Sequence, residues 1–301
     1  MQIRVLGSAA GGGSPQWNCA CPICEQVRAG AVGTRHRTQS SIAVRADAAS
    51  PWLLINASPD VHRQLELLRT PRAEGEPIRS SPVGAVALTD AEFDHASGLL
   101  LMRESTEPLH VLAAQPVRDA LTSEYPIASL LDRWCGVAWQ ELVPDGGARV
   151  EVLGLEIEAF TSGEDAPRYQ DGADGPGASV GLTLRAGGAT VTYSPTVERW
   201  DDSLRTRLAA SDLVLVDGTF WSNDELASHG AGTRTARDMG HVPVGGAGGT
   251  AEQLAALGSG TRCVLIHINN SNPMLLEHGS ERKTLEAVGI AVAFDGMELE
   301  L

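Results

Sequence analysis

The sequence has few basic residues, few cysteines and no long apolar run, and each shortage excludes a class of protein. Against 38 Asp and Glu there are only 23 Lys and Arg, which gives a formal net charge of −15 over 301 residues. Surfaces that bind nucleic acid concentrate Lys and Arg, so no nucleic-acid partner is expected. Five cysteines are too few, and odd in number, for a disulfide framework. No apolar run approaches the roughly 18 to 20 residues of a membrane span.

The first residues, MQIRVLGSAAGGG, lack the charged start and long apolar stretch of a signal peptide. We therefore expect a cytoplasmic protein without membrane insertion. The glycine stretch matches neither the dinucleotide fingerprint nor a phosphate loop, and no Gly-x-Ser-x-Gly elbow is present, so nucleotide binding and serine hydrolase chemistry have no support. Apolar residues make up 43% of the chain, which is enough for a large core, and residues 1–301 are expected to form one domain.

Strands and helices are interleaved twice along the chain, with strand-rich pieces in each half. This order favours an α/β protein in which two sheets are sandwiched between helices over one doubly wound sheet. Ser58 and Pro59 indicate a helix start, as N-cap and first helical residue. Strands are predicted at 2–6, 40–46, 51–56, 83–89, 149–159, 179–186, 189–194, 212–216 and 263–267. Helices are predicted after Ser58 and at 98–104, 114–124, 202–210, 251–257 and 274–287, and long loops at 164–177 and 228–249.

Three cysteines, Cys19, Cys21 and Cys24, form a Cys-x-Cys-x-x-Cys cluster after the first predicted strand. Three thiolates within six residues can wrap one ion, and zinc is the usual occupant in a reducing compartment. Three buried or free thiols are the alternative, which would leave a reactive cluster. We predict a structural zinc loop at residues 17–26, with a fourth ligand from elsewhere in the chain.

A second cluster of polar residues follows the apolar run 83–89. Asp90, Glu92, Asp94 and His95 stand where the predicted central strand ends, which is where α/β proteins place ligands. A carboxylate and an imidazole in adjacent positions can both reach one cation, and this ligand chemistry admits Fe, Mn or Zn. The alternative is an acidic loop that caps the next helix, with Asp94 at its N-terminus.

Three further polar residues are similar in kind. Asp217 follows the strand DLVLV, His267 ends the strand CVLIH, and His241 lies in a glycine-rich loop. A single histidine at a strand end is more often structural than a ligand. Three such positions in one chain reinforce one another as candidates for a site.

These residues together resemble the metallo-β-lactamase fold family. The segments that carry the resemblance are IRVLGSAAGGGSPQWNCACPIC, LLINASPD, TDAEFDHASGLLLMRE, VDGTFWSNDE, MGHVP and HINNSNP, and they span essentially the whole chain. The family carries His-x-His-x-Asp-His after a central strand, where this sequence reads Asp90-Ala91-Glu92-Phe93-Asp94-His95. The resemblance implies an αββα sandwich, with a zinc held by the three cysteines and a second metal site between the sheets.

The departures from the family pattern change the expected chemistry. Asp90 and Glu92 replace two histidine ligands, and Pro195 stands where the family has a bridging aspartate. A dinuclear hydrolytic centre is therefore not expected. The remaining set of Asp94, His95 and His267, with Asp217 as a fourth ligand, suits one divalent ion, Fe2+ in particular.

Related phosphodiesterases with the same cysteine cluster take their fourth zinc ligand from a histidine three positions after the final strand-end histidine. In this sequence that position is Asn270. The resemblance therefore makes Asn270 the candidate fourth ligand of the structural zinc, with water or another residue as alternatives.

Within the family, the sequence is most similar to members that act in biosynthesis of the redox cofactor pyrroloquinoline quinone (PQQ). This implies an iron-dependent, oxygen-using hydroxylation of the tyrosine moiety of a Glu-Tyr-derived precursor peptide. Asp217 and His241 would act as an acid/base pair, while Asp90 and Glu92 would hydrogen-bond ligand imidazoles or bind substrate amines.

Two other functions remain open. One is a carrier that assists movement of PQQ or its precursor towards the periplasm, and the other is a metal-dependent hydrolase. Expected partners are the precursor peptide or its fragment, other proteins of the PQQ pathway, and a second copy of the chain in a homodimer.

Overall fold

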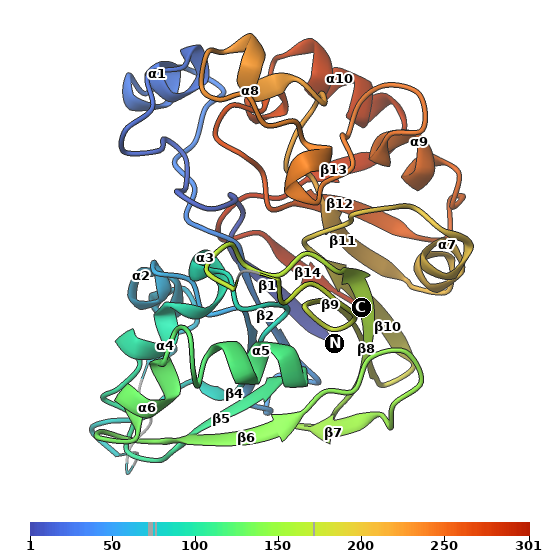
Figure 1. Ribbon diagram of the computed structural model, residues 1–301. Helices are drawn as coiled ribbons and strands as arrows, with labels where there is room; N and C mark the ends of the chain where they lie inside the picture. The colour runs from blue at the N-terminus through green and yellow to red at the C-terminus, as the bar shows by residue number, and fades with distance from the viewer. Residues whose placement is uncertain (72–74, 76, 171) are drawn as a thin grey trace.

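Two seven-stranded sheets face each other in the computed structural model, which describes residues 1–71, 75, 77–170 and 172–301 (Figure 1). The first sheet has the order β14-β1-β2-β3-β4-β5-β6 and the second the order β13-β12-β11-β10-β9-β8-β7. The first sheet consists of β1 (Gln2–Gly7), β2 (Ser41–Arg45), β3 (Trp52–Ile55), β4 (Val83–Ala87), β5 (Leu109–Ala113), β6 (Val137–Glu141) and β14 (Glu298–Glu300). The second consists of β7 (Val150–Val152), β8 (Leu155–Gly163), β9 (Ser179–Ala186), β10 (Ala189–Ser194), β11 (Leu213–Asp217), β12 (Arg262–Ile266) and β13 (Ile290–Val292).

The core lies between the sheets, where both contribute apolar side chains. Leu54 in β3 and Leu112 in β5 belong to the same buried cluster as Leu182 in β9 and Leu215 in β11. Because each sheet hides one apolar face against the other, burial of these side chains holds the two layers together. The αββα sandwich predicted from the sequence is confirmed.

Helices cover the outer faces (Figure 1). Helices beside the first sheet are α2 (Val61–Glu66), α3 (Phe93–Ala96), α4 (Gly98–Leu101), α5 (Gln115–Ala120) and α6 (Ile127–Leu131). The second sheet carries α7 (Asp202–Ala209), α9 (Thr250–Ala255) and α10 (Ser280–Ala287), with α1 (Pro22–Arg28) and α8 (Glu225–Ser228) nearby. Ile23, Leu208, Leu254 and Leu285 from four of these helices form a second buried cluster with β11 and β12. No helix in the described ranges combines the length and the apolar character that a membrane crossing requires.

Several predicted boundaries were wrong. The strand expected at 149–159 is the hairpin of β7 and β8, because Leu153 and Gly154 both adopt positive φ and reverse the chain. The helix expected from Pro59 begins at Val61, and the Ser58 hydroxyl instead donates to Gln64 Oε1 (2.8 Å). The helix expected at 98–104 ends at Leu101.

Other elements were missed or divided. The helix expected at 274–287 consists of a 3-10 turn (Pro273–Leu275) followed by α10. Strands β5, β6, β13 and β14 were not predicted, because short strands without clear alternation depend on their neighbours in the sheet for definition. The loop expected at 228–249 is irregular apart from the end of α8 and a 3-10 turn (Arg237–Met239). The described part of loop 164–177 contains neither helix nor strand, and Asp171 lies outside the described residues.

The strand ends bring the polar residues to one edge of the sandwich. Strands β11 and β12 run parallel, and Asp217 at the end of β11 pairs with Ile266 at the end of β12. His267 directly follows Ile266, so Asp217 and His267 lie at the same edge of the sheet. The short helix α3 follows β4 and carries Asp94 and His95. The candidate site therefore forms where both sheets end.

Candidate metal centre

Asp94, His95 and His267 converge on one point at the edge of the sandwich. Asp94 Oδ2 lies 3.7 Å from His95 Nε2 and 3.5 Å from His267 Nε2. Ligand atoms that share one ion at about 2.1 Å lie roughly 3.4 Å apart in tetrahedral geometry, so this spacing fits a single cation. His95 Nε2 is buried and has no hydrogen-bond partner among the described residues. A bound ion would satisfy this nitrogen.

Asp90 fixes the orientation of His95 from behind. Its two carboxylate oxygens lie 2.8 and 2.7 Å from His95 Nδ1, so the Nδ1 proton is donated to Asp90 and Nε2 faces the cavity. The hydroxyl of Thr89 donates to Asp90 Oδ2 (2.8 Å), and the backbone amide of Glu92 donates to Oδ1 (3.0 Å). A carboxylate that holds the far nitrogen of a ligand histidine is a common feature of metal sites.

The charges of this site are tightly coupled. Burial opposes the imidazolium form of His95, but the carboxylates of Asp90 and Asp94 outweigh it and raise the pKa of His95 to about 9. Burial likewise opposes ionisation of Asp94, yet His95 and His267 hold its pKa far below the usual value. Partial burial and the nearby Asp90 and Asp94 raise the pKa of Glu92 to about 7. A cation that binds here displaces the proton of His95.

Asp217 has both oxygens engaged within the protein. Its Oδ1 accepts from the amide (2.9 Å) and the hydroxyl (2.6 Å) of Thr219, and its Oδ2 lies 2.8 Å from His241 Nδ1. The amide of Val197 also donates to Oδ2 (3.0 Å). Despite complete burial, His241 and these hydrogen bonds lower the pKa of Asp217, so it is ionised. These contacts favour a role for Asp217 in holding His241. Its role as a metal ligand stays a prediction.

Thr219 joins the two halves of the site. Its Oγ1 lies 2.8 Å from His267 Nδ1 and 3.2 Å from His241 Nδ1. Asp217, His241 and His267 have ligand atoms close enough to hold a second ion. Because the Thr219 hydroxyl is within hydrogen-bond distance of all three residues, hydrogen bonding connects this triplet. Sequence reasoning missed Thr219, whose hydroxyl gives no signal in a motif.

A cavity of about 720 Å³ opens above the ligand triad. His95, His241 and His267 line its floor, and Arg168 and Arg234 from the two long loops line its rim. The rings of Phe93 and Tyr169 stack 5.2 Å apart with 8° between their planes at one wall. Glu92 also lines the cavity, so a contact with substrate is open to it, whereas Asp90 is engaged with His95. The arginines and aromatics were not predicted, because the sequence does not show which loop residues turn inward.

The three cysteines meet a fourth polar side chain. The sulfur atoms of Cys19, Cys21 and Cys24 lie within 4.8 Å of one another. The buried Asn270 donates from Nδ2 to Cys24 Sγ (3.2 Å) and lies 3.9 Å from Cys21 Sγ. Burial raises the pKa of the Cys24 thiol to about 11. Three sulfur atoms and one amide oxygen fit a tetrahedral zinc site. A simple flip of the Asn270 amide would turn its oxygen towards the cysteines in place of its nitrogen.

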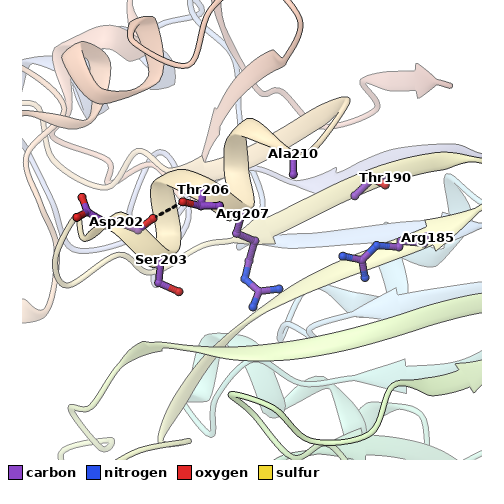
Figure 2. A pocket seen from close by; sticks show the side chains of 7 residues that line it. All are labelled: Arg185, Thr190, Asp202, Ser203, Thr206, Arg207 and Ala210. Atoms are coloured by element: carbon purple, nitrogen blue, oxygen red, sulfur yellow. Dashed lines mark hydrogen bonds between the residues drawn. The ribbon is translucent and has the colours of Figure 1, made fainter.

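A shallower cavity of about 500 Å³ lies far from this edge, between α7 and strands β9 and β10 (Figure 2). Arg185 and Arg207 project into it. Both guanidinium groups pair with Glu158, at 3.1 and 2.7 Å, and Arg185 also lies 3.7 Å from a Glu156 oxygen. The positive charges are thus compensated within the protein, and the cavity is not assigned as an anion site.

Comparison with known proteins gives three findings. Residues 51–268 match the family described as "Beta-lactamase superfamily domain". The chain is 43% identical to "Coenzyme PQQ synthesis protein B" of Azoarcus sp. (strain BH72), with 100% of both chains covered, and 43% identical to the protein of the same name from Cupriavidus necator, with 99% of both covered. The crystal structure of Zn(2+)-bound PqqB from Methylobacterium extorquens superimposes with a TM-score of 0.90 at 37% identity over 100% of both chains.

Proposed function

The chain belongs to the coenzyme PQQ synthesis protein B family of the beta-lactamase superfamily, and we propose that it serves PQQ biosynthesis as a mononuclear iron-dependent oxygenase. The observation that carries the proposal is the convergence of Asp94, His95 and His267 on one point, with His95 Nε2 buried and facing it. Two imidazoles and one carboxylate with open positions form the ligand set of non-haem Fe(II) oxygenases.

Asp94, His95 and His267 would hold the ion, and when bound it would supply the electron exchange with O2 that ring hydroxylation requires. The chain itself provides rigidity. Asp90 fixes one imidazole and Thr219 contacts the other, so both Nε2 atoms keep their direction. A dinuclear hydrolase of this family would hold one of its two ions with the histidines that are Asp90 and Glu92 here, and Asp90 is already engaged with His95. This supports one ion over a dinuclear hydrolytic centre.

His241 is placed to move a proton during the reaction. Its Nδ1 is held by the ionised Asp217, which leaves Nε2 for a substrate on the cavity side. A carboxylate behind an imidazole stabilises the imidazolium form, so Nε2 can accept a proton from a phenol or from the ring carbon that gains oxygen. Asp217 would then act through His241 and not on the substrate itself.

The cavity suits a substrate that carries both an aromatic ring and ionised groups. Phe93 and Tyr169 offer a stacked aromatic wall, and Arg168 and Arg234 offer positive charge at the rim. A tyrosine-containing fragment of a Glu-Tyr-derived precursor has both features. We propose this fragment as the substrate. The proposed metals are iron at Asp94, His95 and His267 and zinc at the three cysteines.

The test is oxygen incorporation by the metal-loaded protein. The metal-free protein is loaded anaerobically with Fe(II), mixed with a Glu-Tyr peptide and ascorbate, and exposed to isotopically labelled O2. Ascorbate supplies the two electrons that reduce the second oxygen atom of O2 to water while the first enters the ring. We expect a mass gain of one labelled oxygen on the tyrosine. His95→Ala and His267→Ala should abolish this gain, while His62→Ala, a change on the exposed face of α2, should not.

Three outcomes would overturn the proposal. Undiminished hydroxylation in both ligand variants would remove the triad from the reaction. Zinc-dependent cleavage of a chromogenic phosphodiester, without oxygen uptake, would support a hydrolase. Tight PQQ binding without turnover of any precursor would support a carrier.

A further inference from the structure

The Thr219 hydroxyl lies at the junction of the two histidines and the aspartate behind the triad. It is 2.6 Å from Asp217 Oδ1, 2.8 Å from His267 Nδ1 and 2.9 Å from the His267 carbonyl oxygen. Thr219 itself is 2% exposed. A hydroxyl has one proton to donate, so only one of these contacts can be its principal donation.

The short contact with Asp217 decides where that proton lies. Two oxygen atoms 2.6 Å apart repel unless a proton stands between them, and an ionised carboxylate has none to give. The Thr219 proton is therefore donated to Asp217 Oδ1. The Thr219 oxygen then has only lone pairs to offer His267. In the hydrogen bond between these two residues the donor must therefore be His267 Nδ1.

We propose that Thr219 is a positioning residue that sets the tautomer of His267. Because Nδ1 donates to Thr219, the neutral His267 ring carries its lone pair on Nε2, which faces Asp94 Oδ2 at 3.5 Å. Two acceptors face each other there, an arrangement that a cation between them relieves. The opposite tautomer would donate from Nε2 to Asp94 and have no lone pair for an ion.

The backbone of His267 is also held in an unusual conformation beside the Thr219 hydroxyl. His267 has a φ of +59°, a left-handed backbone conformation that residues other than glycine rarely adopt. The residue directly follows β12, and the hydroxyl of Thr219 contacts both its ring and its carbonyl group. The chain around it is also fixed, since Gly218 and Asn269 donate backbone hydrogen bonds across this junction. The backbone hydrogen bonds thus hold the chain at this ligand, and the Thr219 hydroxyl accepts from its ring.

This inference rests on the proposed metal site, but its first test needs no metal. Nitrogen NMR of the metal-free, labelled protein reports which ring nitrogen of each histidine carries the proton, and His267→Gln identifies the signal. We expect His267 to be protonated at Nδ1 in the wild type and in Thr219→Ser. A proton on Nε2 in the wild type would overturn the assignment, whatever the variants do.

The second test is zinc affinity by chelator competition. Thr219→Val keeps the shape and loses the hydroxyl, and we expect it to weaken binding at the triad by about 10- to 100-fold, while Thr219→Ser restores it. Wild-type affinity in Thr219→Val would refute the positioning role while the triad stands. Wild-type affinity in His267→Ala would instead refute the proposed metal site.

Discussion

Asp90 holds His95 in place through two contacts, at 2.8 and 2.7 Å from its oxygens to His95 Nδ1, and leaves His95 Nε2 directed into the cavity. In the metallo-β-lactamase pattern a histidine ligand stands where this chain has Asp90. The substitution therefore converts a position that binds metal into one that orients a neighbouring ligand. On the proposed account the site would hold one ion where the family pattern holds two.

Asp90→Asn should weaken the active-site metal. The amide keeps the shape but loses the negative charge that supports the Nδ1 proton, so affinity for zinc is expected to fall about tenfold. Chelator competition on the purified variants measures this. Glu92→Gln is the matched control, because the Glu92 side chain lines the same cavity without a hydrogen bond to the His95 ring, and it should stay near the wild type. Equal affinity in Asp90→Asn and the wild type would show that His95 needs no such support.

The structural zinc should stabilise the active site at a distance. Asn270, which contacts Cys24, lies three positions after the proposed ligand His267. Cys24→Ser is expected to lose one zinc per chain, to unfold at lower temperature and to bind the second metal more weakly, because the segment that carries His267 loses its anchor. Metal analysis and thermal unfolding test this. Cys135→Ser, outside the cluster, should retain both metals. Two metals with normal affinity in Cys24→Ser would separate the two sites.

Asn270 should respond to a better ligand. An imidazole binds zinc more strongly than an amide, so Asn270→His is expected to slow zinc release to a chelator, and Asn270→Ala to accelerate it. Release at the wild-type rate in both variants would mean that water or another residue completes the site. Asn270 would then be only a neighbour of the cysteines.

Glu158 should stabilise the second sheet through Arg185 and Arg207 (Figure 2 shows both arginines). Burial opposes its ionisation, but the two arginines lower its pKa below the ordinary value of 4.5. A lowered pKa in the folded state contributes stability above the unfolded value, and the contribution disappears as the pH falls through the folded value. Glu158→Gln should therefore cost about 1 kcal/mol near pH 7, and this cost should shrink as the pH falls below 4.5 towards the folded pKa of Glu158.

Urea unfolding at several pH values measures this dependence. Glu151→Gln on β7 is the control, since Glu151 is exposed on the same sheet. A loss in Glu158→Gln that stays constant down to pH 3 would point to packing and not to charge.

Sequence reasoning selected candidate residues where the signal is local. Asp94 and His95 come after β4, Asp217 ends β11 and His267 follows β12, and these strand ends lie at one edge of the sandwich. Thr219 escaped notice because its meaning depends on His267, which is 48 residues away. The division of roles was equally invisible, since only the fold shows that both oxygens of Asp217 are engaged.

The short strands were not predicted for a similar reason. β5 and β6 take their register from each other along five paired residues, and neither has the alternation that marks a strand alone. The turn at Leu153 and Gly154 divides the strand that was expected at 149–159. It was not predicted, because leucine is not a typical turn residue and the sequence does not show that its φ is positive. Tertiary pairing fixed what the local pattern left undetermined.

The most direct test of a single-ion centre is anomalous diffraction from crystals loaded anaerobically with Fe(II), with data on either side of the iron edge. We expect one iron peak per chain among Asp94, His95 and His267, and a separate zinc peak at Cys19, Cys21 and Cys24. Two adjacent peaks at the cavity floor, or none beside the triad, would contradict the account.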